Sequence, residues 1–168
     1  NKAVQKGELG EKEVLREAFS KAKKGRLHLV GLVSDGGVHS HQDHLVALVT
    51  AAKEAGVEDI MAHAITDGRD TSPTGGADYL RSVEDSLAEH GARIATVVGR
   101  YFAMDRDRRW ERTKLGWDAI VHGIGEESEL LASEAVAEQY REDRTDEFLP
   151  ALIFDEPGSQ RVRNGDVV

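Results

Sequence analysis

Three short, predominantly apolar runs, at positions 27–33, 59–65 and 92–98, divide the first hundred residues of the chain. The stretches between them carry apolar residues at every third or fourth position, which is the spacing of one face of a helix. The run at 27–33 is almost uninterrupted and predicts a strand buried on both faces, as in a parallel sheet. Strand, loop and helix alternate three times, so the pattern predicts an α/β fold with a mainly parallel sheet and helices on both faces, in three layers.

Amphipathic patterns predict three of the helices, at residues 8–24, 42–55 and 133–141. A further helical pattern contains Trp110 and Trp117, seven residues apart and therefore on one helix face. We expect both tryptophans to belong to the core rather than to a stacking surface.

The C-terminal part of the chain departs from the alternating pattern. Runs at 151–154 and 162–168 flank the turn residues Glu156-Pro157-Gly158-Ser159, which predicts a C-terminal β-hairpin. We find no internal repeat and no linker, so residues 1–168 are expected to form a single domain. The chain begins without Met and stops within a β-like pattern, which we interpret as the sign of an excised domain.

Composition narrows the classes of partner. The chain has 168 residues and a net charge of −9, which argues against nucleic acid or an anionic membrane as the main partner. There is no cysteine, so disulfides and thiolate metal sites are excluded. No long apolar run and no apolar signal region are present, and we expect a soluble, cytoplasmic protein.

Arginine is concentrated between Gly99 and Arg112, directly after the third predicted strand. This stretch holds five arginines against three carboxylates, a local balance of +2 in an otherwise acidic chain. Guanidinium groups are planar, forked donors that bind carboxylates and phosphates through two hydrogen bonds. The stretch therefore indicates an anion-binding site. The alternative is an ordinary solvated face, on which neighbouring Asp and Arg side chains pair with each other.

Loops that follow parallel strands share one edge of the sheet, where open α/β domains bind their ligands. We therefore expect the loops 34–41, 66–73 and 99–107 to converge, although Asp35 and Asp67 have the alternative role of holding their own turns. Arginines here would hold an acidic group, and Asp and His side chains would exchange protons with a hydroxyl, which suits a small, anionic, hydroxylated molecule. The side chains available are Asp35, His39, His41, Asp67, Arg69, Asp70, Arg100 and Arg106.

One motif favours a different chemistry. The sequence His39-Ser40-His41-Gln42-Asp43-His44 matches His-x-His-x-Asp-His, the first metal-binding motif of the metallo-β-lactamase fold. An alternative function is therefore a zinc-dependent hydrolase that uses His39, His41, Asp43 and His44. That fold needs further ligands downstream, which the remaining histidines do not supply in the expected context. For Asp43 and His44 we favour the role of first-turn residues of a helix.

Other catalytic signatures are missing from the sequence. There is no nucleophile elbow and no phosphate-binding P-loop. His28 and His63 lie within predicted strands, where we expect buried histidines with satisfied hydrogen bonds rather than metal ligands. A third hypothesis is therefore a binding module with no chemistry of its own.

Three long motifs together resemble one known family. Ser34-Asp35-Gly36-Gly37-Val38-His39-Ser40-His41, Asp67-Gly68-Arg69-Asp70 and the stretch Gly99–Trp110 are similar to the cofactor-independent phosphoglycerate mutases, in that family's order and approximate spacing. Asn1-Lys2-Ala3-Val4 and Thr145–Pro150 also resemble it, so the similarity covers nearly the whole chain.

The resemblance implies an isomerase of glycolysis that interconverts 3-phosphoglycerate and 2-phosphoglycerate through a phosphoserine. The family has two domains, and this chain resembles only the inserted, substrate-binding one. The serine and two manganese ions belong to the other domain, so the resemblance implies no metal in this chain. It also implies that the missing domain is the partner of this chain, and that the chain alone is inactive.

The resemblance also implies roles for individual residues. His39, Arg69, Asp70, Arg100 and Arg106 match the family's substrate contacts by motif position. The arginines would bind the anionic groups of phosphoglycerate. Asp70 and His39 would meet the hydroxyl that gives or takes the phosphate, with Asp70 the candidate catalytic residue, as a proton shuttle. Such a domain would hold the glycerate while it turns between two transfers.

Overall fold

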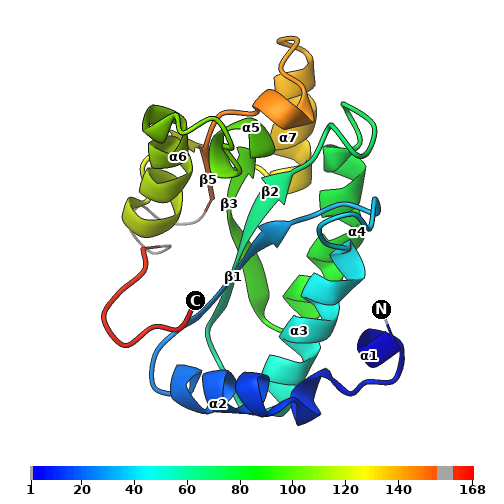
Figure 1. Ribbon diagram of the computed structural model, residues 1–168, viewed down its shortest axis with the longest axis vertical. Coiled ribbons are helices and arrows are strands. Elements are labelled where there is room, and N and C mark those ends of the chain that lie inside the picture. The colour runs from blue at the N-terminus through cyan, green and yellow to red at the C-terminus, as the bar shows by residue number, and fades with distance from the viewer. Residues whose placement is uncertain (1, 155–160) are drawn as a thin grey trace.

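A twisted sheet with the strand order β1-β2-β3-β5-β4 runs through the middle of the protein (Figure 1). The computed structural model describes residues 2–154 and 161–168. Strands β1, β2 and β3 are parallel, and β5 runs antiparallel to β3 and parallel to β4. The α/β fold with a mainly parallel sheet is thus confirmed. The strands are β1 (Leu27–Leu32), β2 (Ile60–Thr66), β3 (Ala92–Gly99), β4 (Glu126–Glu127) and β5 (Leu152–Ile153).

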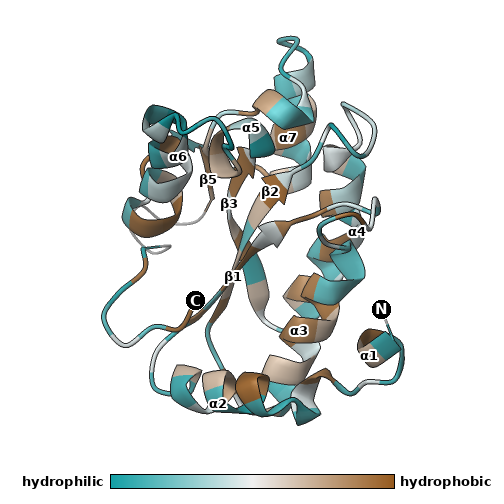
Figure 2. Ribbon diagram, viewed as in Figure 1, coloured by the Kyte–Doolittle hydropathy of each residue, from teal (hydrophilic) through white to brown (hydrophobic). Residues whose placement is uncertain are grey.

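Helices cover both faces of this sheet, as expected, with α3 and α4 on one side and α6 on the other (Figure 1). Figure 2 shows the apolar residues gathered on the strands and along α3. The larger core cluster joins the sheet to α2, α3, α4 and α7, and a smaller cluster of Leu32, Ile65 and Val98 packs under α5. The helical elements are α1 (Lys2–Gln5), η1 (Leu9–Glu11), α2 (Glu13–Ala22), α3 (Gln42–Glu54), α4 (Gly76–Glu89), α5 (Arg100–Ala103), α6 (Trp110–Trp117), η2 (Asp118–His122), α7 (Ala132–Tyr140) and η3 (Asp146–Phe148).

The prediction that the run at 27–33 forms a strand buried on both faces is wrong; the fully buried strand is β2 instead. β1 lies at the edge of the sheet, and Val30 is 42% exposed there. All seven residues of β2 are buried, because strands flank it on both sides and helices cover it. An apolar run therefore predicted a strand correctly in both places, but not its position in the sheet.

The predicted C-terminal hairpin is also wrong. Leu152 and Ile153 lie between β3 and β4, whereas Val167 forms a parallel bridge with Leu27 at the far edge of the sheet. The expected turn at 156–159 falls outside the described residues. The two apolar runs do not pair because each of them completes a different part of the sheet.

The helical patterns were more accurate in length than in burial. The helices predicted at 42–55 and 133–141 are present within a residue at each end, and the one at 8–24 is divided into η1 and α2. Trp110 and Trp117 are 74% and 59% exposed, so the prediction that they are core residues is wrong. The reason is that α6 packs through small residues: a Cβ on Gly116 would lie only 3.3 Å from the Ala103 Cα of α5.

His28 and His63 are buried strand residues with hydrogen-bonded rings, as predicted. His63 Nδ1 lies 2.9 Å from Thr96 Oγ1, His63 Nε2 lies 2.8 Å from His28 Nδ1, and His28 Nε2 lies 3.3 Å from Asp166 Oδ2. Because a carboxylate only accepts, His28 Nε2 donates to Asp166. His28 Nδ1 then accepts from His63 Nε2, and His63 Nδ1 accepts from the Thr96 hydroxyl. This set of bonds is complete with both rings neutral, and burial, which lowers the pKa of both histidines, favours that form. The chain of bonds crosses three strands.

This neutral pair makes stability depend on pH. Burial, followed by repulsion from His28 once that ring is protonated and from Arg26, lowers the pKa of His63 to about 3. The unfolded chain takes up a proton at this ring near pH 6.5, and the folded chain does not. The contribution of His63 to stability is therefore fully present above pH 6.5 and is lost progressively as the pH falls toward 3. We expect the free energy of unfolding to fall by as much as about 1.4 kcal/mol per pH unit for this group below pH 6. Urea titrations followed by circular dichroism between pH 7 and pH 5 measure the slope.

The matched comparison is between His63→Gln, which removes the titrating ring, and His122→Gln, which removes an exposed one. The slope should be shallower in the first variant and unchanged in the second. An identical slope in wild type and His63→Gln would contradict this assignment.

Candidate functional site

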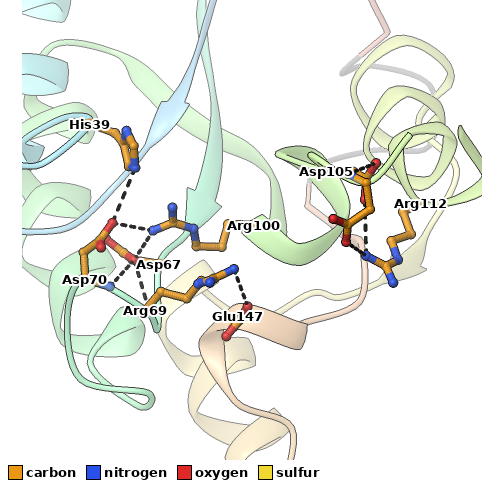
Figure 3. Close-up of polar contacts among 9 residues, drawn as sticks. His39, Asp67, Arg69, Asp70, Arg100, Asp105, Arg112 and Glu147 are labelled. Atoms are coloured by element: carbon orange, nitrogen blue, oxygen red, sulfur yellow. Dashed lines mark hydrogen bonds and ion pairs between the residues drawn. The ribbon is translucent and has the colours of Figure 1, made fainter. Parts of the chain in front are cut away.

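The three loops predicted to converge do meet at the carboxyl ends of β1, β2 and β3. Ser34 Oγ, from the first loop, donates to Asp67 Oδ2 at 3.1 Å. Arg100 Nη1, after the third strand, donates to Asp67 Oδ1 at 2.6 Å and to Asp70 Oδ2 at 2.7 Å (Figure 3). His39 Nε2 lies 3.5 Å from Asp70 Oδ2, so each loop contributes to one connected set of polar groups.

Asp67 is at the centre of this set. Its side chain is 3% exposed and also accepts the backbone N–H groups of Arg69 and Asp70, at 3.1 and 3.0 Å. Burial works against ionisation, but hydrogen bonds from the Asp70 and Arg69 amides, the Arg100 guanidinium and Ser34 outweigh it and lower the pKa of Asp67. The turn-holding role considered for Asp67 is therefore confirmed, and the same carboxylate also anchors Arg100.

Arg100 differs from an open anion-binding arginine because it is buried and paired with two carboxylates. Its side chain is 8% exposed. Burial disfavours the charged form, but hydrogen bonds to Asp70 and Asp67 more than compensate and raise the pKa of the guanidinium. Most of its charge is thus balanced by Asp67 and Asp70.

A pocket of about 310 Å³ opens beside this set. Four of the five predicted site residues line it, namely His39, Arg69, Arg100 and Arg106, and the fifth, Asp70, contacts two of them. Two acidic side chains on the pocket wall pair with arginines of the same wall. Glu147 lies 3.5 Å from Arg69, and Asp105 lies 3.2 Å from Arg112. Arg106 is exposed, and no carboxylate among residues 2–154 and 161–168 pairs with it. The remaining lining residues are Tyr101, Met104 and Asp107.

Glu147 belongs to η3, a short helix that sequence reasoning did not assign to the site. The backbone of η3 lies against the strand ends: the Thr66 hydroxyl donates to the Asp146 carbonyl at 2.7 Å, and a Cβ on Gly99 would lie 2.5 Å from the Glu147 carbonyl oxygen. The buried Asp146 side chain accepts the Gly76 N–H at 2.7 Å and the Tyr140 hydroxyl. The similarity of Thr145–Pro150 to the mutase family was the signal that could have identified this element.

The motif that favoured a zinc site does not form one in the structure. His41 Nδ1 accepts the Asp43 backbone N–H at 3.2 Å and so caps α3, while Asp43 and His44 lie in the first turn of that helix, as favoured above. His39 faces Asp70 instead. Within the described part of the chain, no three His, Asp or Glu side chains gather closely enough to hold a metal ion.

The arrangement supplies two chemical functions side by side. Guanidinium groups on one wall of the pocket can bind an acidic group, and Arg69, half-exposed and 3.5 Å from Glu147, can exchange that contact for one with another anion. Asp70, with His39 on its open side, can accept a proton from a hydroxyl or return it. Among the described residues no helix is long and apolar enough to cross a membrane.

Comparison with known proteins agrees with the resemblance seen in the motifs. A family model described as "BPG-independent PGAM N-terminus" matches residues 1–168. Relatives named 2,3-bisphosphoglycerate-independent phosphoglycerate mutase include those of Akkermansia muciniphila, 56% identical over 166 residues, and Haloarcula marismortui, 52% identical over 162 residues. These matches cover 99% and 94% of this chain but 32% and 30% of the relatives, so the chain spans about a third of their length.

A solved structure shows the same fold. The phosphoglycerate mutase of Leishmania mexicana, crystallised at low cobalt concentration, superimposes with a TM-score of 0.90 at 32% sequence identity. The match covers 98% of this chain and 32% of the Leishmania chain. Because the family model matches every residue, this chain belongs to the family of BPG-independent phosphoglycerate mutases, in the region that the family model names the N-terminus.

Proposed function

We propose that this chain is the substrate-binding domain of a phosphoglycerate mutase, and that it holds 2- or 3-phosphoglycerate while phosphate moves between the two hydroxyls. The contact of Asp70 with both His39 and Arg100, beside a pocket lined by arginines, carries this assignment. It puts a proton acceptor next to cations that suit a carboxylate and a phosphate. The names of the relatives supply the substrate class.

The transfer proceeds in two balanced steps. In the first, the bond from phosphorus to the oxygen on carbon 3 breaks, a bond from phosphorus to a serine oxygen forms, and the serine proton ends on the released hydroxyl. In the second, the hydroxyl on carbon 2 attacks the phosphoserine, and its proton ends on the serine. Asp70 takes the proton of the attacking hydroxyl, and His39 holds that hydroxyl in place.

Arg69 and Arg106 bind the acidic groups of the ligand, whereas Arg100 has mainly a positioning role. Because Arg100 is buried between Asp67 and Asp70, it fixes the Asp70 carboxylate and presents one edge to the pocket. Glycerate that is held by its acidic group can turn in the pocket without leaving it, since the donors that grip it are separate from Asp70.

The serine and the two manganese ions are assigned to the part of the enzyme that lies outside this chain. The described residues offer no cluster of His, Asp and Glu side chains suited to a divalent cation. When bound, manganese would stabilise the charge on the phosphoryl group and the serine oxygen. Closure of that part over the pocket would exclude water, which otherwise hydrolyses the phosphoserine.

Binding should be detectable in this chain. Isothermal titration calorimetry with 3-phosphoglycerate should show one site, and Arg106→Ala should weaken it by about tenfold or more, because a charge-assisted contact with the acidic group is lost. Arg141→Ala removes the same charge from an exposed position directly after α7 and should leave the affinity unchanged. Failure of the wild-type chain to bind, or equal effects of the two variants, would refute the assignment.

Turnover should be absent, since the serine is assigned elsewhere. Incubation of the chain with 3-phosphoglycerate and manganese, followed by phosphorus NMR, should yield no 2-phosphoglycerate. Conversion that follows this chain through size-exclusion chromatography and is abolished by Asp70→Asn would show that the chain carries its own nucleophile.

The Asp67–Arg100 pair should be essential for the stability of the site. Asp67→Ala leaves a buried guanidinium with one of its two carboxylates, and removing a partner from a buried pair costs about 3–5 kcal/mol. Urea unfolding followed by circular dichroism measures this loss. Asp78→Ala breaks the exposed contact with Arg81 and serves as the control, for which we expect a free energy of unfolding close to that of wild type. Similar losses in the two variants would contradict the central role of Asp67.

A further inference from the structure

The loop that carries Arg106 is wound around the carboxylate of Asp105. This side chain is 3% exposed, and its Oδ2 accepts the backbone N–H groups of Asp107 at 3.2 Å and Arg109 at 2.8 Å. Both donors follow Arg106 in the chain, so the two bonds close the loop immediately after it. The backbone at Arg106 is therefore held by the hydrogen bonds that Asp105, the preceding residue, accepts.

The same loop contains a backbone conformation that does not form readily on its own. Arg108 has a φ of +60°, in the left-handed region that residues with a side chain rarely adopt. It lies between the two amides that Asp105 binds. Unfavourable backbone geometry persists where the surrounding contacts impose it, and such positions cluster at functional sites.

Arg112 connects this loop to the rest of the pocket. Its Nη1 donates to Asp105 Oδ1 at 3.2 Å and to Asp107 Oδ2 at 3.3 Å, and its guanidinium carbon lies 3.8 Å from the centre of the Tyr101 ring. Tyr101 belongs to α5, directly after the Arg100 that pairs with Asp67. Figure 3 shows Asp105 and Arg112 facing each other, at a distance from the polar groups that surround Asp67.

Arg106 is the arginine that this framework leaves available to a ligand. Arg69, Arg100 and Arg112 each contact a carboxylate, whereas Arg106 has no acidic partner among residues 2–154 and 161–168. We propose that Asp105, bound to Arg112, is a positioning residue that holds the 105–109 loop so that Arg106 faces the pocket. This role deepens the function proposed above and rests on it for the identity of the ligand.

The first experiment measures the affinity for 3-phosphoglycerate in a double-mutant cycle. Asp105→Ala should weaken binding by about tenfold, similarly to Arg106→Ala, because the cation is no longer oriented. In the Arg106→Ala background, Asp105→Ala should have almost no further effect. Asp105→Asn keeps an oxygen that accepts the two amides and should retain most of the affinity. Glu111→Ala, on exposed α6, removes the same charge and should change nothing.

Additive losses in the cycle would overturn the proposal, because Asp105 would then act independently of Arg106. Equal effects of Asp105→Ala and Glu111→Ala would also overturn it, since the loss would reflect net charge alone.

A second experiment needs no ligand. Limited digestion with trypsin should cut Asp105→Ala after Arg108 and Arg109 at least several times faster than wild type, with Asp105→Asn in between. Unchanged cleavage would overturn the proposal even if 3-phosphoglycerate binds. Faster cleavage in a chain that does not bind 3-phosphoglycerate would support the loop's dependence on Asp105 and refute the proposed ligand instead.

Discussion

The ion pair between Asp67 and Arg100 is the contact on which the geometry of the site depends. A charge removed from water is tolerated only when its hydrogen-bonding capacity is satisfied, and Asp67 meets this condition by binding groups from all three loops. The loops cannot shift relative to one another without leaving a buried charge unpaired. Three segments that are distant in the sequence are therefore held at fixed separation by one carboxylate, which is what a small ligand requires of its site.

A second constraint is the absence of space between η3 and the ends of the strands. Added Cβ atoms at Gly68 and Gly99 would lie 2.7 Å from the Glu147 nitrogen and 2.5 Å from its carbonyl oxygen, so the backbone segments are in direct contact. The close approach places Glu147 opposite Arg69. Most arginines of the pocket wall are therefore paired with carboxylates of the same chain: Arg69 with Glu147, Arg100 with Asp67 and Asp70, and Arg112 with Asp105. The local excess of positive charge therefore overstates the charge that a ligand meets.

Sequence patterns predicted the features that depend on neighbouring residues and missed those that depend on tertiary partners. The alternation of strands and helices, the meeting of the three loops and the buried state of His28 and His63 all followed from local pattern and the rules of parallel sheets. The exposure of Val30 did not, because a pattern does not reveal which strand lies at the edge. The hairpin failed for the same reason, since Val167 pairs with β1, which lies more than a hundred residues earlier in the chain. Within the site, periodicity does not distinguish an arginine that is buried between carboxylates, such as Arg100, from one that is open to solvent, such as Arg106.

The exposure of Trp110 and Trp117 has a spectroscopic consequence. They are the two tryptophans of the chain, and both lie on α6, which begins where the Arg106 loop ends. Intrinsic indole emission therefore reports on the solvent around one surface helix and contains little information about the core beneath the sheet. A shift of the emission wavelength on adding an anion would locate the change at α6. An emission spectrum that does not change during an unfolding experiment would not show that the core is intact.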